Sequence, residues 1–199
     1  MEIVLSLPGD QTDTTDLIQQ AIDHCAEAGG GRVVIPPGHH MIATLQLKSY
    51  VELHVQRGAT LQGIYNSPRY CPIAPDLSPM TSLIFARDAE HIAITGAGTI
   101  DGQGPRYWKK LDKRRSGRKD VLEVGVIQFW YQHIKDIHKP NRILAFLNCR
   151  HIQIQDIHLT NASAWTCHLI GSEDIKIRGI DITNPLEGPN TDGIDIDGS

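Results

Sequence analysis

The hydrophobic spacing of a helix occurs close to the N-terminus of the chain. Asp13 is the expected N-cap of this helix, and Asp16 places negative charge in its first turn. The glycines at 29–31 predict the end of the helix, and a strand is expected at 32–35. Between Asp16 and Ala28 the apolar residues follow the i, i+1, i+4, i+5, i+8 spacing that lines one helical face: Leu17, Ile18, Ala21, Ile22, Cys25 and Ala26.

The rest of the chain carries short runs in which apolar and polar residues alternate. A period of two is that of a strand with one buried face. Helical patterns do not alternate with these strands, which argues against a doubly wound α/β sheet. The clearest runs lie at Tyr50–Val55, His91–Thr95, His151–Gln155 and Asp174–Arg178.

Two of these runs belong to an internal repeat of 23 residues. When the segment that starts at His151 is shifted onto the segment that starts at Asp174, every apolar position falls on an apolar position. The segment that starts at His91 has the same form, with a glycine step before Ile100. The coincident pairs are Ile152 with Ile175, Ile154 with Ile177, Ile157 with Ile180, Leu159 with Ile182, and Asn161 with Asn184.

Short strands that repeat at constant phase predict an all-β solenoid, in which each coil stacks on the previous one. Asn161 and Asn184 then share a corner, where Asn tolerates the left-handed conformation and can hydrogen-bond the adjacent coil. The early helix is expected to cap the exposed end of the solenoid. A β-sandwich with regularly spaced strands is the rival interpretation, but sandwich strands do not repeat at constant phase.

Composition places the chain among ordinary folded domains. It has 199 residues, of which 40% are hydrophobic and 21% charged, with a net charge of −4. We expect a single domain over residues 1–199, without a transmembrane helix and without nucleic acid as a partner. No cofactor and no metal site are predicted, because the four cysteines show no CxxC spacing. Cys149 and Cys167 are expected to be buried thiols, with a disulfide as the alternative.

The repeat lapses over residues 105–140, which we interpret as an inserted loop or irregular coils. This segment includes a basic run, Lys109–Lys119, with seven basic residues and one Asp. The run is either a solvated loop or a patch that attracts a polyanion. The N-terminal residues 1–7 lack the basic region and the long apolar run of a signal peptide, so localisation stays open.

The last ten residues, NTDGIDIDGS, contain Asp192, Asp195 and Asp197. Ile194 and Ile196 continue a core ladder, so Asp195 and Asp197 are expected to project outward together. Asp192 would face inward unless the strand begins after it. Outward carboxylates suit general acid and base chemistry on a glycosidic bond. A solvated acidic face and a calcium site are the alternatives.

This C-terminal string resembles the first catalytic motif of the polygalacturonase-type glycoside hydrolases of family 28, which are right-handed parallel β-helices. Three further segments resemble the family's N-terminal cap, an early coil and the coil before the motif. The last of these has Ser163-Ala164-Trp165 where the family usually shows Ser-Pro before Trp. The likeness is weakest over 105–140. The three segments are GDQTDTTDLIQQAIDHCAEAGGGRVVIPPG, GAGTIDGQG and NASAWTCHLIGSEDIKIRGIDITNP.

The resemblance implies a fold, a substrate and site residues. The fold is a right-handed parallel β-helix with an N-terminal capping α-helix, and the substrate is an acidic polysaccharide, the α-1,4-linked galacturonan of pectin. Asp192 would be one of three carboxylates and would help to activate water for hydrolysis with inversion, and Asn190 would help to hold the site. Trp165 and His168 are candidates for a sugar subsite. The alternatives are packing between coils for Trp165 and a plain surface role for His168.

The resemblance also defines what is missing. The family's Gly-Asp-Asp, Gly-His-Gly and Arg-x-Lys motifs lie on later coils, and the sequence contains no Asp-Asp pair and no Gly-His-Gly. We therefore expect an N-terminal portion of a family-28-like enzyme, truncated in its first motif and with little activity alone. Its uncapped last coil would fray over 185–199 or associate with another chain. The resemblance suggests that the protein is secreted or periplasmic.

Two other functions are considered. One is a non-catalytic β-helical module that binds acidic polysaccharide or supports a partner. The other is a pectate lyase, which shares the architecture but would need calcium and a basic residue. The hydrolase-like motif argues against the lyase.

Overall fold

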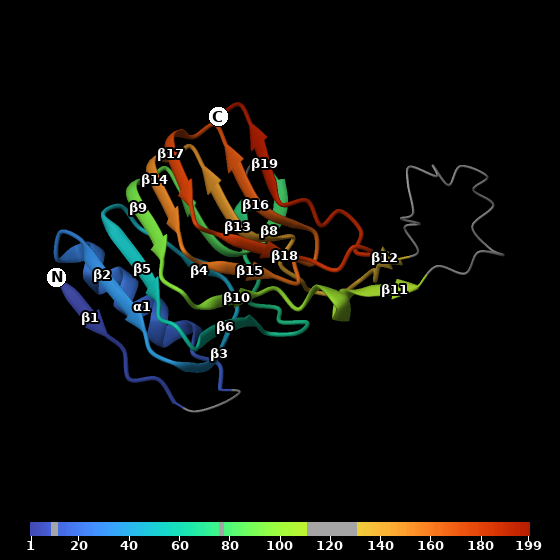
Figure 1. Ribbon diagram of the computed structural model, residues 1–199, viewed down its shortest axis with the longest axis horizontal. Helices are drawn as coiled ribbons and strands as arrows, with labels where there is room; N and C mark the ends of the chain where they lie inside the picture. Colours follow the sequence, from blue (N-terminus) through green and yellow to red (C-terminus); the bar gives the residue numbers. More distant parts are fainter. Residues whose placement is uncertain (9–11, 76–77, 111–130) are drawn as a thin grey trace.

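The computed structural model describes residues 1–8, 12–75, 78–110 and 131–199. Its strands wind into a right-handed parallel β-helix, as predicted, with three sheets along the sides of one coil (Figure 1). Each full turn of the chain adds one strand to every sheet, in the order first, second and third sheet.

The first sheet contains, in spatial order, β1 (Glu2–Val4), β2 (Gly31–Ile35), β5 (Val51–Val55), β9 (Glu90–Thr95), β14 (Arg150–Gln155) and β17 (Glu173–Arg178). The second sheet contains β3 (Gly38–Ile42), β6 (Ala59–Gly63), β10 (Thr99–Asp101), β15 (His158–Thr160) and β18 (Asp181–Thr183). The third sheet contains β4 (Leu45–Gln46), β8 (Ser78–Arg87), β13 (Arg142–Leu147), β16 (Trp165–Ile170) and β19 (Ile194–Asp197), with β7 (Pro72–Ala74) antiparallel to β8.

The 23-residue repeat is confirmed as the register between coils. Ile152 pairs with Ile175 on one side and with Ile92 on the other, and Leu159 pairs with Ile182. These side chains point into the coil and belong to one continuous apolar core. Because the phase of the repeat is constant, like residues stack on like residues. Each buried side chain therefore packs against its counterparts in the preceding and the following coil.

The corner asparagines join successive coils, as expected. Asn161 adopts the left-handed conformation, with φ of 52°. Its side-chain amide donates to Asp101 of the preceding coil at 3.1 Å, and the Asn184 carbonyl oxygen accepts the Ala162 backbone N–H at 2.9 Å. These bonds satisfy polar groups where the chain turns between sheets.

Helix α1 (Thr15–Glu27) covers the N-terminal end of the core with Ile18 and Ile22, which are fully buried. The expectation that Asp13 is the N-cap is wrong, because Thr14 occupies that position. Asp13 lies one residue before the N-cap, and its carboxylate accepts a hydrogen bond from the Thr15 backbone N–H at 2.9 Å.

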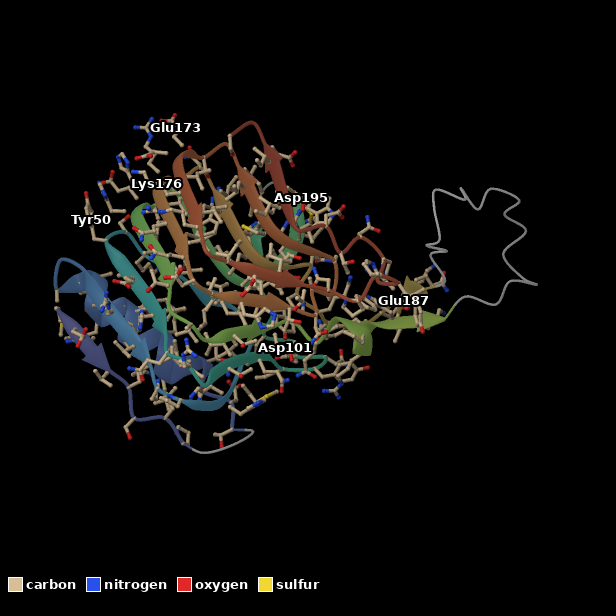
Figure 2. All side chains as sticks on the ribbon, in the orientation of Figure 1. Tyr50, Asp101, Glu173, Lys176, Glu187 and Asp195 are labelled. Atoms are coloured by element: carbon tan, nitrogen blue, oxygen red, sulfur yellow. The ribbon has the colours of Figure 1, made fainter. Side chains whose placement is uncertain are left out.

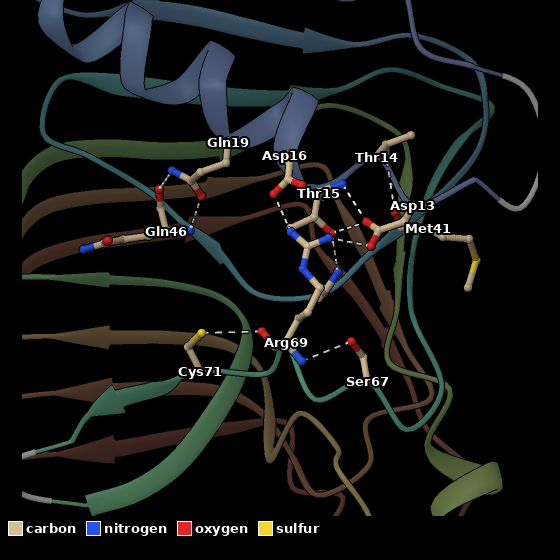
Figure 3. A network of polar contacts seen from close by, with 11 residues as sticks. Asp13, Thr14, Thr15, Asp16, Gln19, Met41, Gln46, Ser67, Arg69 and Cys71 are labelled. Atoms are coloured by element: carbon tan, nitrogen blue, oxygen red, sulfur yellow. Dashed lines mark hydrogen bonds and ion pairs between the residues drawn. The ribbon is translucent and has the colours of Figure 1, made fainter.

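Arg69 anchors the start of this helix from a different part of the chain. Its guanidinium pairs with Asp13 at 2.6 Å and also with Asp16 (Figure 3). The pairs are partly exposed, so their main effect is to fix where the helix begins.

The segment predicted as an insertion contributes a short hairpin to the described residues. After the 3₁₀ turn η1 (Gly104–Tyr107), β11 (Trp108–Lys110) pairs antiparallel with β12 (Tyr131–His133). Most of the basic run, from residue 111 onward, lies outside the described residues. The described part of the chain contains no helix long and apolar enough to cross a membrane. All four cysteines are free thiols, and Cys149 and Cys167 are buried.

The core ladders predict that two neighbouring substitutions on β14 lower the free energy of unfolding by unequal amounts. Ile154 is fully buried, so Ile154→Ala should lower the free energy of unfolding by about 2–5 kcal/mol through lost burial and a residual cavity. Gln153→Ala, on the outer face of the same strand, is the matched control and should change it by less than about 0.5 kcal/mol. Denaturant unfolding measures both, and equal effects would contradict the assigned register.

The last coil exposes apolar surface that earlier coils cover. Ile194 and Ile196 are 41% and 64% exposed, and β17, β18 and β19 each pair on one side only within the described residues. We expect a chain of these 199 residues to self-associate through this face. Sedimentation velocity should show association that weakens in Ile196→Lys but not in Leu17→Lys, an exposed apolar control on α1. A monomeric wild-type chain at high concentration would refute this.

Candidate active site

The outer face of the third sheet positions the predicted site residues. Along this face, Phe85, Ala145, His168 and Asp195 lie in register on β8, β13, β16 and β19. Their sequence neighbours point the other way, since Cys167 is in the core and pairs with Ile194. Because side chains alternate along a strand, the core ladder dictates that His168, Asp195 and Asp197 all face outward.

Asp195 and Asp197 have different surroundings on this face. Asp197 accepts a hydrogen bond from His168 Nε2 at 2.7 Å, and its side chain is mostly exposed. One oxygen of Asp195, Oδ2, is buried without a hydrogen-bond partner. Figure 2 shows Asp195 on the side of the coil opposite Tyr50 and Lys176. The exposed Asp197 carboxylate can therefore accept from a bound hydroxyl or water, whereas the buried Oδ2 of Asp195 is closed off from solvent.

Burial raises the pKa of Asp195 above its ordinary value of 3.8, and the negative charge of Asp192 raises it further. The positive charge of Arg142 acts in the opposite direction. Asp195 therefore holds its proton more readily than a free aspartic acid.

His168 lies beneath these carboxylates and contacts Arg142 and Trp165. Its Nδ1 accepts the Arg142 Nε–H at 2.6 Å, and its ring meets Trp165 edge-on, with centroids 4.7 Å apart. The Arg142 guanidinium lies over the Trp165 ring, 4.7 Å from its centroid. His168 is only 2% exposed, so the alternative of a plain surface role for this residue is wrong.

Asp192 and Asn190 lie in the loop that leads into β19. The strand begins at Ile194, so the alternation that would turn Asp192 inward does not apply, and its side chain is exposed. Asn190 is also exposed and has φ of 56°. Asn184 holds this loop, because its amide donates to Thr166 Oγ1 at 2.7 Å and to the Thr191 carbonyl at 3.3 Å.

The structure places Trp165 against His168, which lies on the outer face of the third sheet, whereas Asp192 and Asn190 lie in the loop before β19. Trp165, His168 and Asp195 are linked through direct or charge interactions, and Asp192 acts on Asp195 electrostatically. Asn190 makes no comparable link in the structure and keeps its predicted role as an expectation. Sequence reasoning missed Arg142, which begins the apolar run RILAFL and has no motif to mark it. Across the residues that the structure describes, no three His, Cys, Asp or Glu side chains are grouped to hold a metal ion.

A second polar pair lies on the strands and loops next to this face. Lys139 Nζ and His133 Nε2 are buried and have no hydrogen-bond partner among the residues that the structure describes. Burial lowers the pKa of Lys139 to about 8 and, together with the nearby Lys139 charge, lowers the pKa of His133. Both groups are therefore weaker bases than usual in the folded protein.

This chain is similar to known proteins in both sequence and fold. The model for glycosyl hydrolases family 28 matches residues 25–199. A probable polygalacturonase of Vitis vinifera is 29% identical over 201 residues, which span 94% of this chain and 37% of that protein. A hyperthermoactive exopolygalacturonase from Thermotoga maritima superposes with a TM-score of 0.75 at 27% identity, over 98% of this chain and 49% of its own.

A polygalacturonase from Erwinia carotovora, at 21% identity and a TM-score of 0.71, shares the fold. The chain belongs to glycosyl hydrolases family 28, a family of glycoside hydrolases. It spans well under two thirds of the length of the Vitis and Thermotoga relatives.

The charge interaction between Asp192, in the loop before β19, and Asp195 predicts that the titration of Asp195 depends on its neighbour. Asp195 should titrate above 3.8, and Asp192→Asn should lower its midpoint because a negative neighbour is removed. Carboxyl carbon chemical shifts followed with pH measure this. Since the folded-state pKa lies above the unfolded value, Asp195 favours folding below about pH 4, and that contribution is lost as pH rises through the folded-state pKa. An unchanged midpoint in the variant would show that the two carboxylates do not interact.

Proposed function

We propose that this chain is part of a polygalacturonase that cleaves the α-1,4-linked galacturonan of pectin by hydrolysis with inversion. One observation carries the proposal: in a family 28 chain, the NTDGIDID segment has Asp195 and Asp197 on the outer face of the third sheet and an exposed Asp192 in the loop just before it. The relatives described as polygalacturonase and exopolygalacturonase support galacturonan as the substrate.

The chemistry requires two carboxyl groups in different states. Inverting hydrolysis uses one carboxylate to activate water and one protonated carboxyl to protonate the leaving oxygen, roughly 6.5–9.5 Å apart. In this proposal Asp192, which is exposed ahead of β19, helps to activate the water, and Asn190 helps to hold the site.

Two residues of the preceding strand complete the proposed sugar site. The Trp165 side chain is partly exposed while its ring packs on Arg142 and His168, so packing and sugar contact are compatible roles. His168 is buried and contributes to the site through its hydrogen bond to Asp197. Aromatic rings present an apolar face to a sugar, and a hydrogen-bonded carboxylate accepts from its hydroxyls.

A non-catalytic β-helical module that binds acidic polysaccharide or supports a partner is the second candidate. It is favoured by one observation: the partly exposed Trp165 ring, packed on Arg142, offers a sugar contact that does not depend on a catalytic group. Binding alone does not need a proton donor. The two candidates differ in what Asp192 does, because only a hydrolase uses its carboxylate on a bound substrate.

The test measures polygalacturonate binding by calorimetry and reducing-end release for three chains. These are the wild type, Asp192→Asn, and Asp181→Asn, an exposed aspartate on β18 that serves as the matched control. We expect binding with little release by the wild type. Asp192→Asn should bind about fivefold more tightly, because a carboxylate near a polyanion costs about 1 kcal/mol in water. Asp181→Asn should match the wild type.

Each outcome decides between the functions. Release that disappears only in Asp192→Asn would show hydrolysis by this chain and overturn the expectation that it is incomplete. Equal binding by all three chains would remove Asp192 from the site and favour the binding module. Absence of polygalacturonate binding would overturn galacturonan as the ligand.

A further inference from the structure

Arg142 is a buried cation at the start of β13 that contacts His168, a residue of the outer face of the third sheet. It is 1% exposed, and burial lowers the pKa of its guanidinium. Its Nε–H donates to His168 Nδ1 at 2.6 Å, its Nη2 donates to the Met80 sulfur, and its plane lies on Trp165. A buried guanidinium with these contacts is held in one geometry, since an unpaired buried charge is costly.

Arg142 approaches His168 along β13. Ala145 is the residue of β13 that lies in register with His168. Its small side chain is fully buried, and Arg142 reaches Nδ1 from three residues earlier on the same strand. A larger residue in register would compete for this position.

The direction of the hydrogen bond determines the state of His168. An arginine Nε–H can only donate, so the Nδ1 atom that it meets must accept and carries no proton. The remaining ring proton is then on Nε2, where it donates to Asp197 Oδ2 at 2.7 Å. A doubly protonated imidazole would place two N–H groups against each other at 2.6 Å.

We infer that Arg142 is a positioning residue of the candidate active site: it holds His168 as the neutral Nε2–H tautomer, so that His168 fixes the exposed Asp197 carboxylate to accept from a bound sugar. The second half of this inference rests on the proposed function. The first half concerns only the ring and stands without a substrate.

The charges around the imidazole support this assignment. Asp195 and Asp197 face it from β19, and Arg142 faces it from β13. Burial lowers the pKa of His168 and the positive charge of Arg142 lowers it further, whereas Asp197 raises it. His168 is thus a fixed hydrogen-bond donor, and it is not available as a proton-transfer group while Arg142 is in place.

The test reads the imidazole directly by 15N NMR of the whole chain, with His168→Gln to assign the signals. The wild type should show a His168 ring that carries its proton on Nε2 alone at neutral pH. In Arg142→Met the ring should lose this single tautomer, and its pKa should rise by about one pH unit or more, because the cation is removed while Asp197 remains. Arg142→Lys keeps the positive charge, so the pKa of His168 should rise less in this variant than in Arg142→Met.

Arg150→Met is the matched control, since Arg150 is an exposed arginine at the start of β14 in the first sheet. It should leave the His168 signals unchanged. A wild-type His168 ring that is protonated on Nδ1, or doubly protonated at neutral pH, would overturn the inference. This measurement on the wild type tests the inference even if Arg142→Met does not fold. An unchanged ring in a folded Arg142→Met would overturn it as well.

A parallel titration with oligogalacturonate separates this inference from the proposed function. Binding that perturbs Asp197 and weakens in Arg142→Met supports both. If the ring is as inferred but no oligogalacturonate binds, the proposed function fails while the role of Arg142 in setting the tautomer stands.

Discussion

The vertical register between coils is the constraint on which the rest of this structure depends. Isoleucines and leucines at equal phase fill the interior, and each is covered by its counterparts in adjacent coils. A shift of one residue in any strand would turn its apolar side chains to solvent, so burial fixes the phase strongly. Because the chain alternates, the same burial decides which polar residues face outward.

The candidate site is a consequence of this register on the third sheet. Cys167 and Ile194 are paired in the interior, and their neighbours His168 and Asp195 are therefore paired on the exterior. No separate interaction is needed to bring a histidine and carboxylates from two coils together. A β-helix thus converts a sequence repeat into rows of side chains, and a few unlike residues in one row provide a place for chemistry.

Electrostatics then distinguishes chemically similar groups. Asp195 is partly buried beside Asp192, and its pKa is raised, whereas Asp197 is exposed and bonded to His168. The buried Arg142 offsets part of the negative charge from below and is itself stabilised by stacking on Trp165. The acidic segment is therefore not a uniform solvated face, because its members differ in burial and in hydrogen-bond partners.

The sequence by itself determined the solenoid, because a local period of two and a 23-residue repeat are both properties of the linear chain, and burial acts on them directly. It also indicated the acidic motif and the outward direction of Asp195 and Asp197. Only the tertiary structure decided the burial of His168 and the position of Thr14 as the N-cap in place of Asp13. It alone revealed Arg142 as a partner of His168, since these residues are 26 positions apart and meet through stacking of coils.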